Sequence, residues 1–427
     1  MLSRRRFLQT SSLVAGAGAT FPALALASND KPLPPAIAAL RSLRGEAAPI
    51  TVEERSARQE RARQLMRDNK LSAIFLPQGT SLAYFTGIRW EGGERLFAMV
   101  LPVKGEAFYV SPAFEEGRAR EQIAHAPAGN NPDVRIWQED QSPYARVAEG
   151  LSDRGIAAGT IGVEETAKFL FTDNLRKAAA SAAFTSATPV TSGCRMIKSR
   201  PELDLMRLAS KVTLAAYEAT WRSMKAGMTQ RDVADMLEAA HRQLGFDGGA
   251  DVQVGEFSSF PHGSVTPQVI REGTIVMIDG GCSVEGYQSD ITRTFVLGTA
   301  SDKMKQVFEI VYRAQSAALA AAKPGSEAGS VDAAARKVIT DAGFGPDYKH
   351  FTHRLGHGMG MDGHEWPYLV RGNSTILQPG MTFSDEPGIY IRGEFGIRLE
   401  DDMHITEAGA ELFTPQSPSL DNPFSKT

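Results

Sequence analysis

Cysteine is nearly absent from this chain, which has Cys194 and Cys282 as its only two cysteines in 427 residues. Two thiols cannot form a four-cysteine zinc site, so a site of that kind is excluded. Cys282 follows a predicted strand closely and is expected to be a small buried residue, with a disulfide to Cys194 as the minor alternative. Ligands for any metal must therefore come mainly from histidine and carboxylate side chains.

Long apolar runs and an excess of positive charge are also missing. Apart from the N-terminus there is no run of about 18 apolar residues, so no membrane span is expected. The formal net charge is -4, which makes nucleic acid an unsuitable partner. With 42% hydrophobic and 22% charged residues, the chain has the composition of a globular protein with room for two domains.

The N-terminus has the features of an export signal. Residues 3–9 (SRRRFLQ) are typical of a twin-arginine signal, and an alanine- and glycine-rich stretch leads to a small-residue cleavage site at 25–27. A disordered basic tail is the alternative. We predict a signal peptide at 1–27, a periplasmic mature protein and a poorly ordered, proline-rich lead at 28–50.

Residues 51–195 are predicted to form an α/β domain. Thr51 and Glu54 have the spacing of a capping box, before a charged helix that ends near Asn69. Strands are expected at 71–77, 97–102 and 107–110, and helices near 113–125, 143–153 and 171–180. A domain boundary is expected at 192–199.

Residues 196–427 contain one pattern twice, which predicts a pseudo-twofold α+β domain. Capping signals at Ser199 and Thr229 start two helices, the second of which stops at Gly245, and an acidic hairpin follows. Helices at 302–321 and 331–342 then precede a histidine-rich loop and a second acidic hairpin. A site between two such halves is a favoured place for a pocket.

The first acidic hairpin carries Asp279 and Asp290. Its strands, TIVMIDG and SDITRTFVL, are rich in β-branched residues. A turn centred between Val284 and Glu285 would place the two aspartates directly opposite each other. Opposed side chains lie about 4.5–5.5 Å apart, a spacing that suits carboxylates bridging two metal ions about 3.5–4 Å apart.

The second hairpin, folded about Gly393, places Glu386 opposite Glu400 in the same way. A glycine-framed loop, HRLGHGMG, adds His357 as a fifth ligand candidate. Four carboxylates gathered without a cation would repel one another. The sequence therefore predicts a site for two divalent metal ions, and a hydrolase.

These motifs closely resemble those of the pita-bread metallopeptidases (family M24), in the prolidase and aminopeptidase P branch. The resemblance covers about 50–427, including a creatinase-like N-terminal domain at 51–195. It rests on the segments PHG (261–263), VMIDGG…GYQSDITRTF (276–295), HRLGHGMGMDGHEWP (353–367), FSDEPGIY (383–390) and GIRLEDD (396–402).

The resemblance implies the ligand set and the catalytic groups. The metal ligands are Asp279, Asp290, His357, Glu386 and Glu400. Glu386 is expected to move the proton of a nucleophile that bridges the metal ions as hydroxide. His262 and His364 are expected to bind the substrate and the tetrahedral intermediate, His353 to shape the pocket and Arg398 to brace the carboxylates. Manganese is the favoured metal, with cobalt or zinc as alternatives.

The activity implied is cleavage of the Xaa-Pro bond, preferentially in dipeptides, by a homodimer. A prolyl imide carries no N–H, so ordinary peptidases handle it poorly. The compact turn after Glu386 favours a dipeptidase, whereas Tyr368, which stands where several prolidases have a basic residue, leaves recognition of the substrate carboxylate open. Alternatives are an Xaa-Pro aminopeptidase acting on longer peptides, a creatinase-type hydrolase or noncatalytic module, a methionine aminopeptidase and a dinuclear phosphatase.

Overall fold

The computed structural model describes residues 32–90 and 92–424, so the predicted export signal at 1–27 lies outside the described residues. Within these described ranges, no helix combines the length and the hydropathy that crossing a bilayer requires. Residues from Pro35 onward group together as one unit of the chain.

The N-terminal domain is built on a mixed six-stranded sheet in the order β4-β3-β2-β1-β5-β6. Its strands are β1 (Ala73–Pro77), β2 (Ala98–Pro102), β3 (Phe108–Pro112), β4 (Asp133–Trp137), β5 (Thr160–Val163) and β6 (Ala183–Ser186). Its helices are α3 (Val52–Asp68), α4 (Thr80–Thr86), α5 (Glu116–Ile123), α6 (Pro143–Asp153), α7 (Phe169–Ala178) and α8 (Thr188–Arg195).

Both faces of this sheet are covered, which explains why β1 and β2 read as continuous apolar runs. Ile74 and Leu76 pack into a cluster with residues of α3, α4 and α5. Phe75, on the other face, packs with Phe171 and Leu175 of α7 and with residues of α6. The strands predicted at 71–77, 97–102 and 107–110 correspond to β1, β2 and β3, and the three predicted helices correspond to α5, α6 and α7.

The C-terminal region repeats a helix pair followed by strands. The first copy comprises α9 (Arg200–Trp221), α10 (Gln230–Leu244), β7 (Gly248–Val254), β8 (Ile275–Val284), β9 (Tyr287–Gln288) and β10 (Ile291–Val296). The second comprises α11 (Asp302–Ala321), α12 (Ala328–Ile339), β11 (Gly356–Gly358), β12 (Glu365–Leu369), β13 (Thr382–Asp385), β14 (Gly388–Ile391), β15 (Phe395–Arg398), β16 (Asp401–Ile405) and β17 (Ala410–Leu412).

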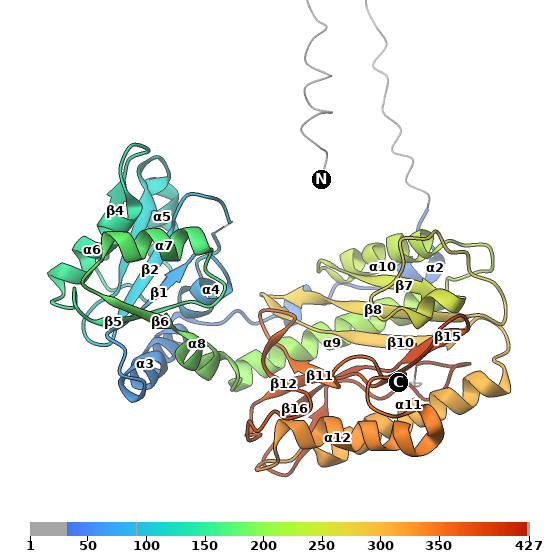
Figure 1. The fold of residues 1–427 in the computed structure, drawn as a ribbon. Helices are drawn as coiled ribbons and strands as arrows, with labels where there is room; N and C mark the ends of the chain where they lie inside the picture. Colours follow the sequence, from blue (N-terminus) through green and yellow to red (C-terminus); the bar gives the residue numbers. More distant parts are fainter. Residues whose placement is uncertain (1–31, 91, 425–427) are drawn as a thin grey trace, which may run out of the picture. The chain divides into compact units, whose positions relative to one another are not determined.

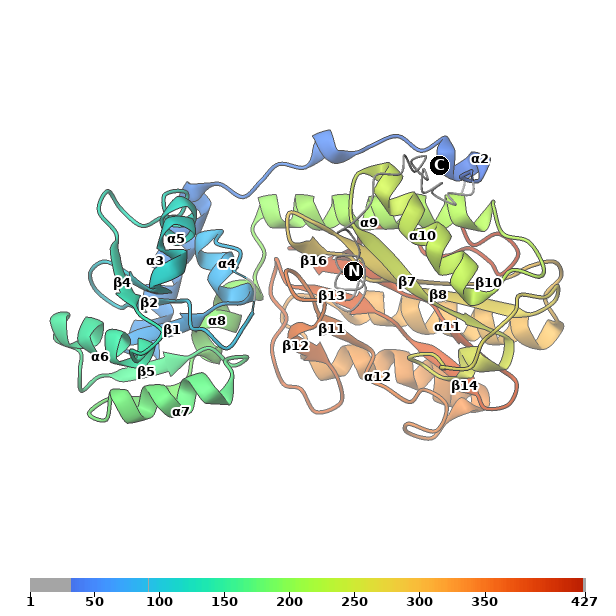
Figure 2. The ribbon, with the colours of Figure 1, turned by 90° about the horizontal axis from the view of Figure 1, so that it is seen from above.

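The two helix pairs enclose the strands (Figures 1 and 2). Residues of α9 and α10 form an apolar cluster with β7, β8 and β10. Those of α11 and α12 form another cluster with β13, β14, β15 and β16. Capping boxes at Ser199 and Thr229 start α9 and α10, and Gly245 ends α10 with a φ of 94°.

The lead segment differs from the prediction. The described part of 28–50 contains the helix α2 (Pro35–Ala38) and the 3-10 helix η1 (Arg44–Glu46). Ile37 and Ile50 are buried and belong to an apolar cluster with residues of α9 and α10. The expectation of poor order, based on proline and alanine content, missed these two anchoring side chains.

Candidate metal centre

The first acidic hairpin has a register that differs from the predicted one. Asp279 pairs with Thr292, and Gly280 pairs with Ile291, so Asp279 and Asp290 are not directly opposite. The prediction was wrong because the turn consists of Glu285 and Gly286, which have φ values of 52° and 93°. Relative to the predicted turn at Val284 and Glu285, this two-residue turn moves the centre of the hairpin by one residue, and it moves the partner of each residue by two positions.

The second hairpin has the predicted register. In β14 and β15 Gly388 pairs with Arg398, and in β13 and β16 Asp385 pairs with Asp401. Both ladders share one register, and Glu386 and Glu400 fall in the gap between them. Neither glutamate takes part in a ladder pair, and the ligand atoms of Glu400 lie within 4.8 Å both of those of Asp279 and Asp290 and of those of Glu386.

The five predicted ligand residues converge. Ligand atoms of Asp279, Asp290 and Glu400 lie within 4.8 Å of one another, and so do those of His357, Glu386 and Glu400. A third group of the same kind consists of Asp290, His357 and His364. Because the groups share members, the donors surround one continuous space and do not form separate sites.

His357 presents an acceptor nitrogen to these carboxylates. Its Nδ1 lies 3.1 Å from the carbonyl oxygen of Gly358, so Nδ1 carries the hydrogen and Nε2 is the acceptor. Nε2 lies 3.4 Å from Glu386 Oε1 and 3.8 Å from Asp290 Oδ2. Burial, followed by the neighbouring His364, lowers the pKa of His357 to about 3, which keeps the ring neutral.

The carboxylates are too many for the positive charge that the chain provides. Burial raises the pKa of Glu386 to about 8. Burial and the neighbouring carboxylates hold the pKa values of Asp290 and Glu400 well above their ordinary range. Carboxylate oxygens and an imidazole nitrogen that face one another without a donor between them fit divalent cations. The residues that could hold such ions are Asp279, Asp290, His357, Glu386 and Glu400.

Arg398 is the cation that the chain does provide, and its exposed fraction is 2%. Its Nη2 donates to Asp279 Oδ2 at 2.6 Å, and its Nε donates to the hydroxyl of Thr292 at 2.9 Å. Burial alone would raise the pKa of Asp279, but attraction by Arg398 and hydrogen bonding outweigh it, and the pKa is lowered. Arg398 thereby keeps Asp279 ionised and fixed in orientation.

Thr292 and Tyr390 are two site residues that the sequence reasoning missed. The Thr292 hydroxyl lies 2.8 Å from Asp279 Oδ1 and 2.6 Å from Glu400 Oε2, between one carboxylate of each hairpin. The Tyr390 hydroxyl accepts from Arg398 Nη1 at 2.9 Å and lies 2.7 Å from His353 Nε2. Thr292 follows Asp290 by two residues in one predicted strand, and this spacing could have indicated it.

His353 is oriented at both of its ring nitrogens. Nδ1 faces the carbonyl oxygen of Arg354 at 2.7 Å and therefore carries the hydrogen, so Nε2 accepts from the Tyr390 hydroxyl. Burial lowers the pKa of His353 to about 3. The ring is thus a neutral, fixed wall, with Nδ1 3.8 Å from Glu386 Oε2.

The other two predicted histidines lie at the exposed side of the site. His364 stacks on His357 with ring centres 3.6 Å apart, and it is exposed. His262 is also exposed, in a loop whose preceding residue, Pro261, accepts a hydrogen bond from Arg398 Nη1 at 3.0 Å. A single buried arginine therefore connects the predicted ligand Asp279, the Tyr390–His353 pair and the loop that carries His262.

Fold and site together define a metallopeptidase, and the chain belongs to metallopeptidase family M24, whose model matches residues 204–407. Residues 58–197 match the Creatinase/Prolidase N-terminal domain. The pita-bread fold class predicted from the sequence is thereby confirmed.

Three relatives illustrate the similarity. The chain is 32% identical to the Xaa-Pro dipeptidase of Lactobacillus delbrueckii subsp. lactis, over 83% of this chain and 96% of that protein. It is also 32% identical to the Xaa-Pro dipeptidase of Pyrococcus furiosus, over 84% and 97%. The crystal structure of dipeptidase PepE from Mycobacterium ulcerans superposes with a TM-score of 0.81 at 32% identity, covering 88% of this chain and 99% of that one.

Proposed function

We propose that the protein hydrolyses the Xaa-Pro bond of dipeptides. The observation that carries this proposal is the convergence of four carboxylates and a neutral histidine on one space, in a chain similar along most of its length to Xaa-Pro dipeptidases. When bound, divalent ions supply Lewis acidity toward the scissile carbonyl and toward the attacking water. The remaining work falls to side chains of the protein.

Glu386 is positioned to take the proton of the attacking water. Its Oε1 accepts from the Ser384 hydroxyl at 3.1 Å, which fixes the carboxylate, and Oε2 faces His353. A general base of this kind contributes about 10²–10⁴-fold to the rate. His353 cannot compete for that proton, because both of its nitrogens are engaged.

His364 and His262 are the groups available to the substrate. Both side chains are exposed beside the ligand cluster, and a neutral imidazole can donate to the carbonyl oxygen on which negative charge develops. Burial, followed by repulsion from Arg354, lowers the pKa of His364, so the ring stays neutral at neutral pH.

The choice between dipeptidase and aminopeptidase is tested by product analysis. The metal-loaded protein should cleave Ala-Pro to alanine and proline and should leave Ala-Pro-Ala nearly untouched. Rapid release of alanine from the tripeptide would show that the aminopeptidase alternative is correct. No turnover of either peptide, with the metal content verified, would refute both.

Manganese is the metal that we propose, because the donor set is mainly oxygen with one imidazole. After the protein is stripped with a chelator, activity should return most fully with Mn²⁺. Equal or better recovery with Zn²⁺ or Co²⁺ would change the assignment. Metal analysis of the protein purified without added metal would identify the native ion.

We further propose a homodimeric protein located in the periplasm. The support for export is the sequence at residues 3–9 and 25–27, and the support for the dimer is family resemblance. Replacing Arg4 and Arg5 with lysine should retain the protein in the cytoplasm, which fractionation would detect. Sedimentation equilibrium of the mature chain should give twice the monomer mass, and a monomer mass would refute the dimer.

A further inference from the structure

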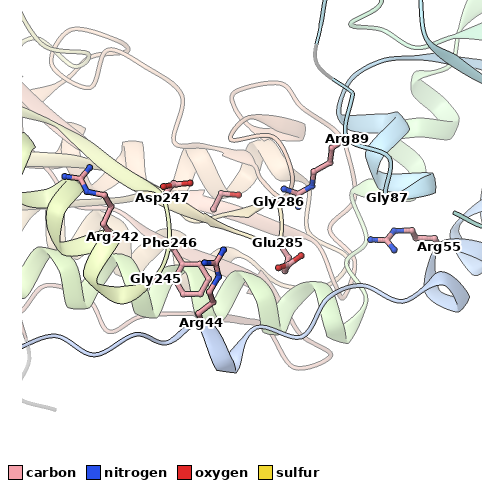
Figure 3. Close-up of a pocket in the computed structure, with 11 residues that line it drawn as sticks. Arg44, Arg55, Gly87, Arg89, Arg242, Gly245, Phe246, Asp247, Glu285 and Gly286 are labelled. Atoms are coloured by element: carbon pink, nitrogen blue, oxygen red, sulfur yellow. The ribbon is translucent and has the colours of Figure 1, made fainter. Parts of the chain in front are cut away.

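A second cavity, apart from the metal ligands, is lined by arginine side chains (Figure 3). Its volume is about 580 Å³, within the range of about 300–1,000 Å³ typical of small-molecule sites. The charged lining residues are Arg44, Arg55, Arg89, Arg242, Asp247 and Glu285. Four cations and two carboxylates line the cavity, and Arg242 also has an ion-pair partner outside the lining, Glu238.

These arginines come from parts of the chain that are distant in sequence. Arg44 lies in η1, Arg55 in the first half of α3, Arg89 just after α4, and Arg242 in the last turn of α10. The tip of the first acidic hairpin, Gly286, forms part of the same wall. Four separate segments therefore bring arginine side chains to the lining of one space, where Asp247 and Glu285 compensate only part of their mutual repulsion.

Three of the four guanidinium groups have no hydrogen-bond or ion-pair partner among the described residues. Across residues 32–90 and 92–424, no hydrogen bond or ion pair involves the side chains of Arg44, Arg55 or Arg89, whereas Arg242 pairs with Glu238 at 3.3 Å. Arg55 Nε is buried and unpaired. Burial, followed by repulsion from Arg58, lowers the pKa of Arg55, and attraction by Tyr287 and Glu285 offsets only part of this shift.

Gly87 explains how Arg55 is held at the wall without hydrogen bonds. This residue ends α4 with a φ of 80°, and a Cβ built on it would lie 2.7 Å from Arg55 Cζ. The guanidinium plane therefore packs against glycine backbone that no other residue could provide. The N–H groups of Arg55 that face the cavity remain free to donate to a ligand.

We propose that this cavity binds a small anion of the phosphate class. Guanidinium forks match phosphate oxygens in geometry, and such an anion would give Arg44, Arg55 and Arg89 the charged partner that they lack among the described residues. A nucleic acid is disfavoured, because the whole chain has a net charge of -4 and these arginines line one cavity. The anion is either inorganic or the phosphate group of an ester.

Calorimetric titration of the full-length, metal-loaded protein tests this proposal. Inorganic pyrophosphate should bind saturably to the wild type, with affinity at least about tenfold lower in Arg55→Gln and in Arg89→Gln, since each substitution removes a charge-assisted contact. Arg41→Gln is the matched control, because Arg41 is an exposed arginine outside the cavity that contacts backbone carbonyls only. Its affinity should equal that of the wild type.

Two results would overturn the proposal: the absence of saturable binding to the wild type, and wild-type affinity in both cavity variants, which would assign the heat to the metal centre. Arg55→Gln should change the thermal midpoint little, because among the described residues Arg55 forms no hydrogen bond or ion pair, and the exposed Arg89 gives a second variant that does not perturb packing. Glycerol 3-phosphate in a parallel titration distinguishes an ester from free phosphate. Binding is read without turnover, so the outcome is independent of the proposed peptidase activity.

Discussion

At the scale of single residues, a substitution at Glu386 tests whether the carboxylate cluster is catalytic or only structural. Glu386→Gln keeps the volume of the side chain but removes both the base and an anionic ligand. We expect Xaa-Pro turnover to fall by about 10³-fold or more, together with a loss of bound metal. The measurement is the rate of Ala-Pro hydrolysis, accompanied by metal analysis.

A matched variant controls for the loss of charge. Glu394→Gln changes a carboxylate at the tip of the same hairpin, where Glu394 forms an exposed pair with Lys303. This variant should retain the activity of the wild type. Retention of activity in Glu386→Gln itself would refute the role assigned to Glu386.

Thr292 offers a test of how the ligands are oriented. Thr292→Val removes the hydroxyl between Asp279 and Glu400 without changing the side-chain shape, and we expect metal affinity to fall by about 10–100-fold. Thr292→Ser keeps the hydroxyl and should restore most of the affinity, as measured by metal titration. Equal losses in both variants would indicate a packing effect and would contradict the orienting role.

At the scale of elements, helices were predictable and one strand register was not. The capping boxes at Ser199 and Thr229 and the glycine at 245 are local signals, and they located α9 and α10 from sequence alone. The pairing of Asp279 depended on which two residues form a turn. Glutamate at a positive φ is unusual, so the sequence pointed to the wrong centre.

Two further features, the strand β7 and the role of Tyr390, could not be predicted from the sequence. The strand β7 reads GGADVQV and has neither apolar alternation nor β-branched content over its first half, so propensity gave no signal. Tyr390 was inconspicuous because a tyrosine in a strand is more often a core residue. Its role depends on Arg398 and His353, which only the tertiary fold brings to its hydroxyl.

The turn at Glu285 gives a prediction about stability. Replacing Glu285 with asparagine, which tolerates a positive φ, creates the Asn-Gly pair that two-residue hairpin turns favour. We expect a gain of up to about 1 kcal/mol, because glutamate has a steric cost in the left-handed region that asparagine partly avoids, and it is measured as a rise in the calorimetric unfolding midpoint. Gly286→Ala should lower the midpoint, and the opposite order of the two variants would contradict the turn assignment.

At the scale of the whole molecule, the carboxylate cluster links folding to metal and to pH. Without metal ions the pKa of Glu386 is about 8, raised above its ordinary value of 4.5 by burial, and those of Asp290 and Glu400 are raised in the same direction. A carboxyl group whose pKa is raised by folding contributes to stability, and this contribution is complete when the pH is below the pKa that the group has in the unfolded chain. This contribution is lost as the pH rises through the folded value.

We therefore expect the metal-free protein to lose stability steadily from about pH 4.5 to about pH 8. The lowered pKa of Asp279 opposes this trend only at the acidic end. The stability that bound metal adds should increase with pH and be largest at the highest pH. The reason is that metal binding displaces protons from the ligands. Thermal unfolding of both forms across this range is the measurement, and parallel pH profiles would contradict the linkage.

The shared register on either side of Glu386 and Glu400 also limits how the gene can change in length. One extra codon within either arm of that hairpin would turn Glu386 or Glu400 toward the opposite face and remove its carboxylate from the site. Codons added at the tip, beyond Ile391 and before Phe395, leave both arms in phase. Insertions among homologous genes should accordingly accumulate at that tip and be purged from the arms.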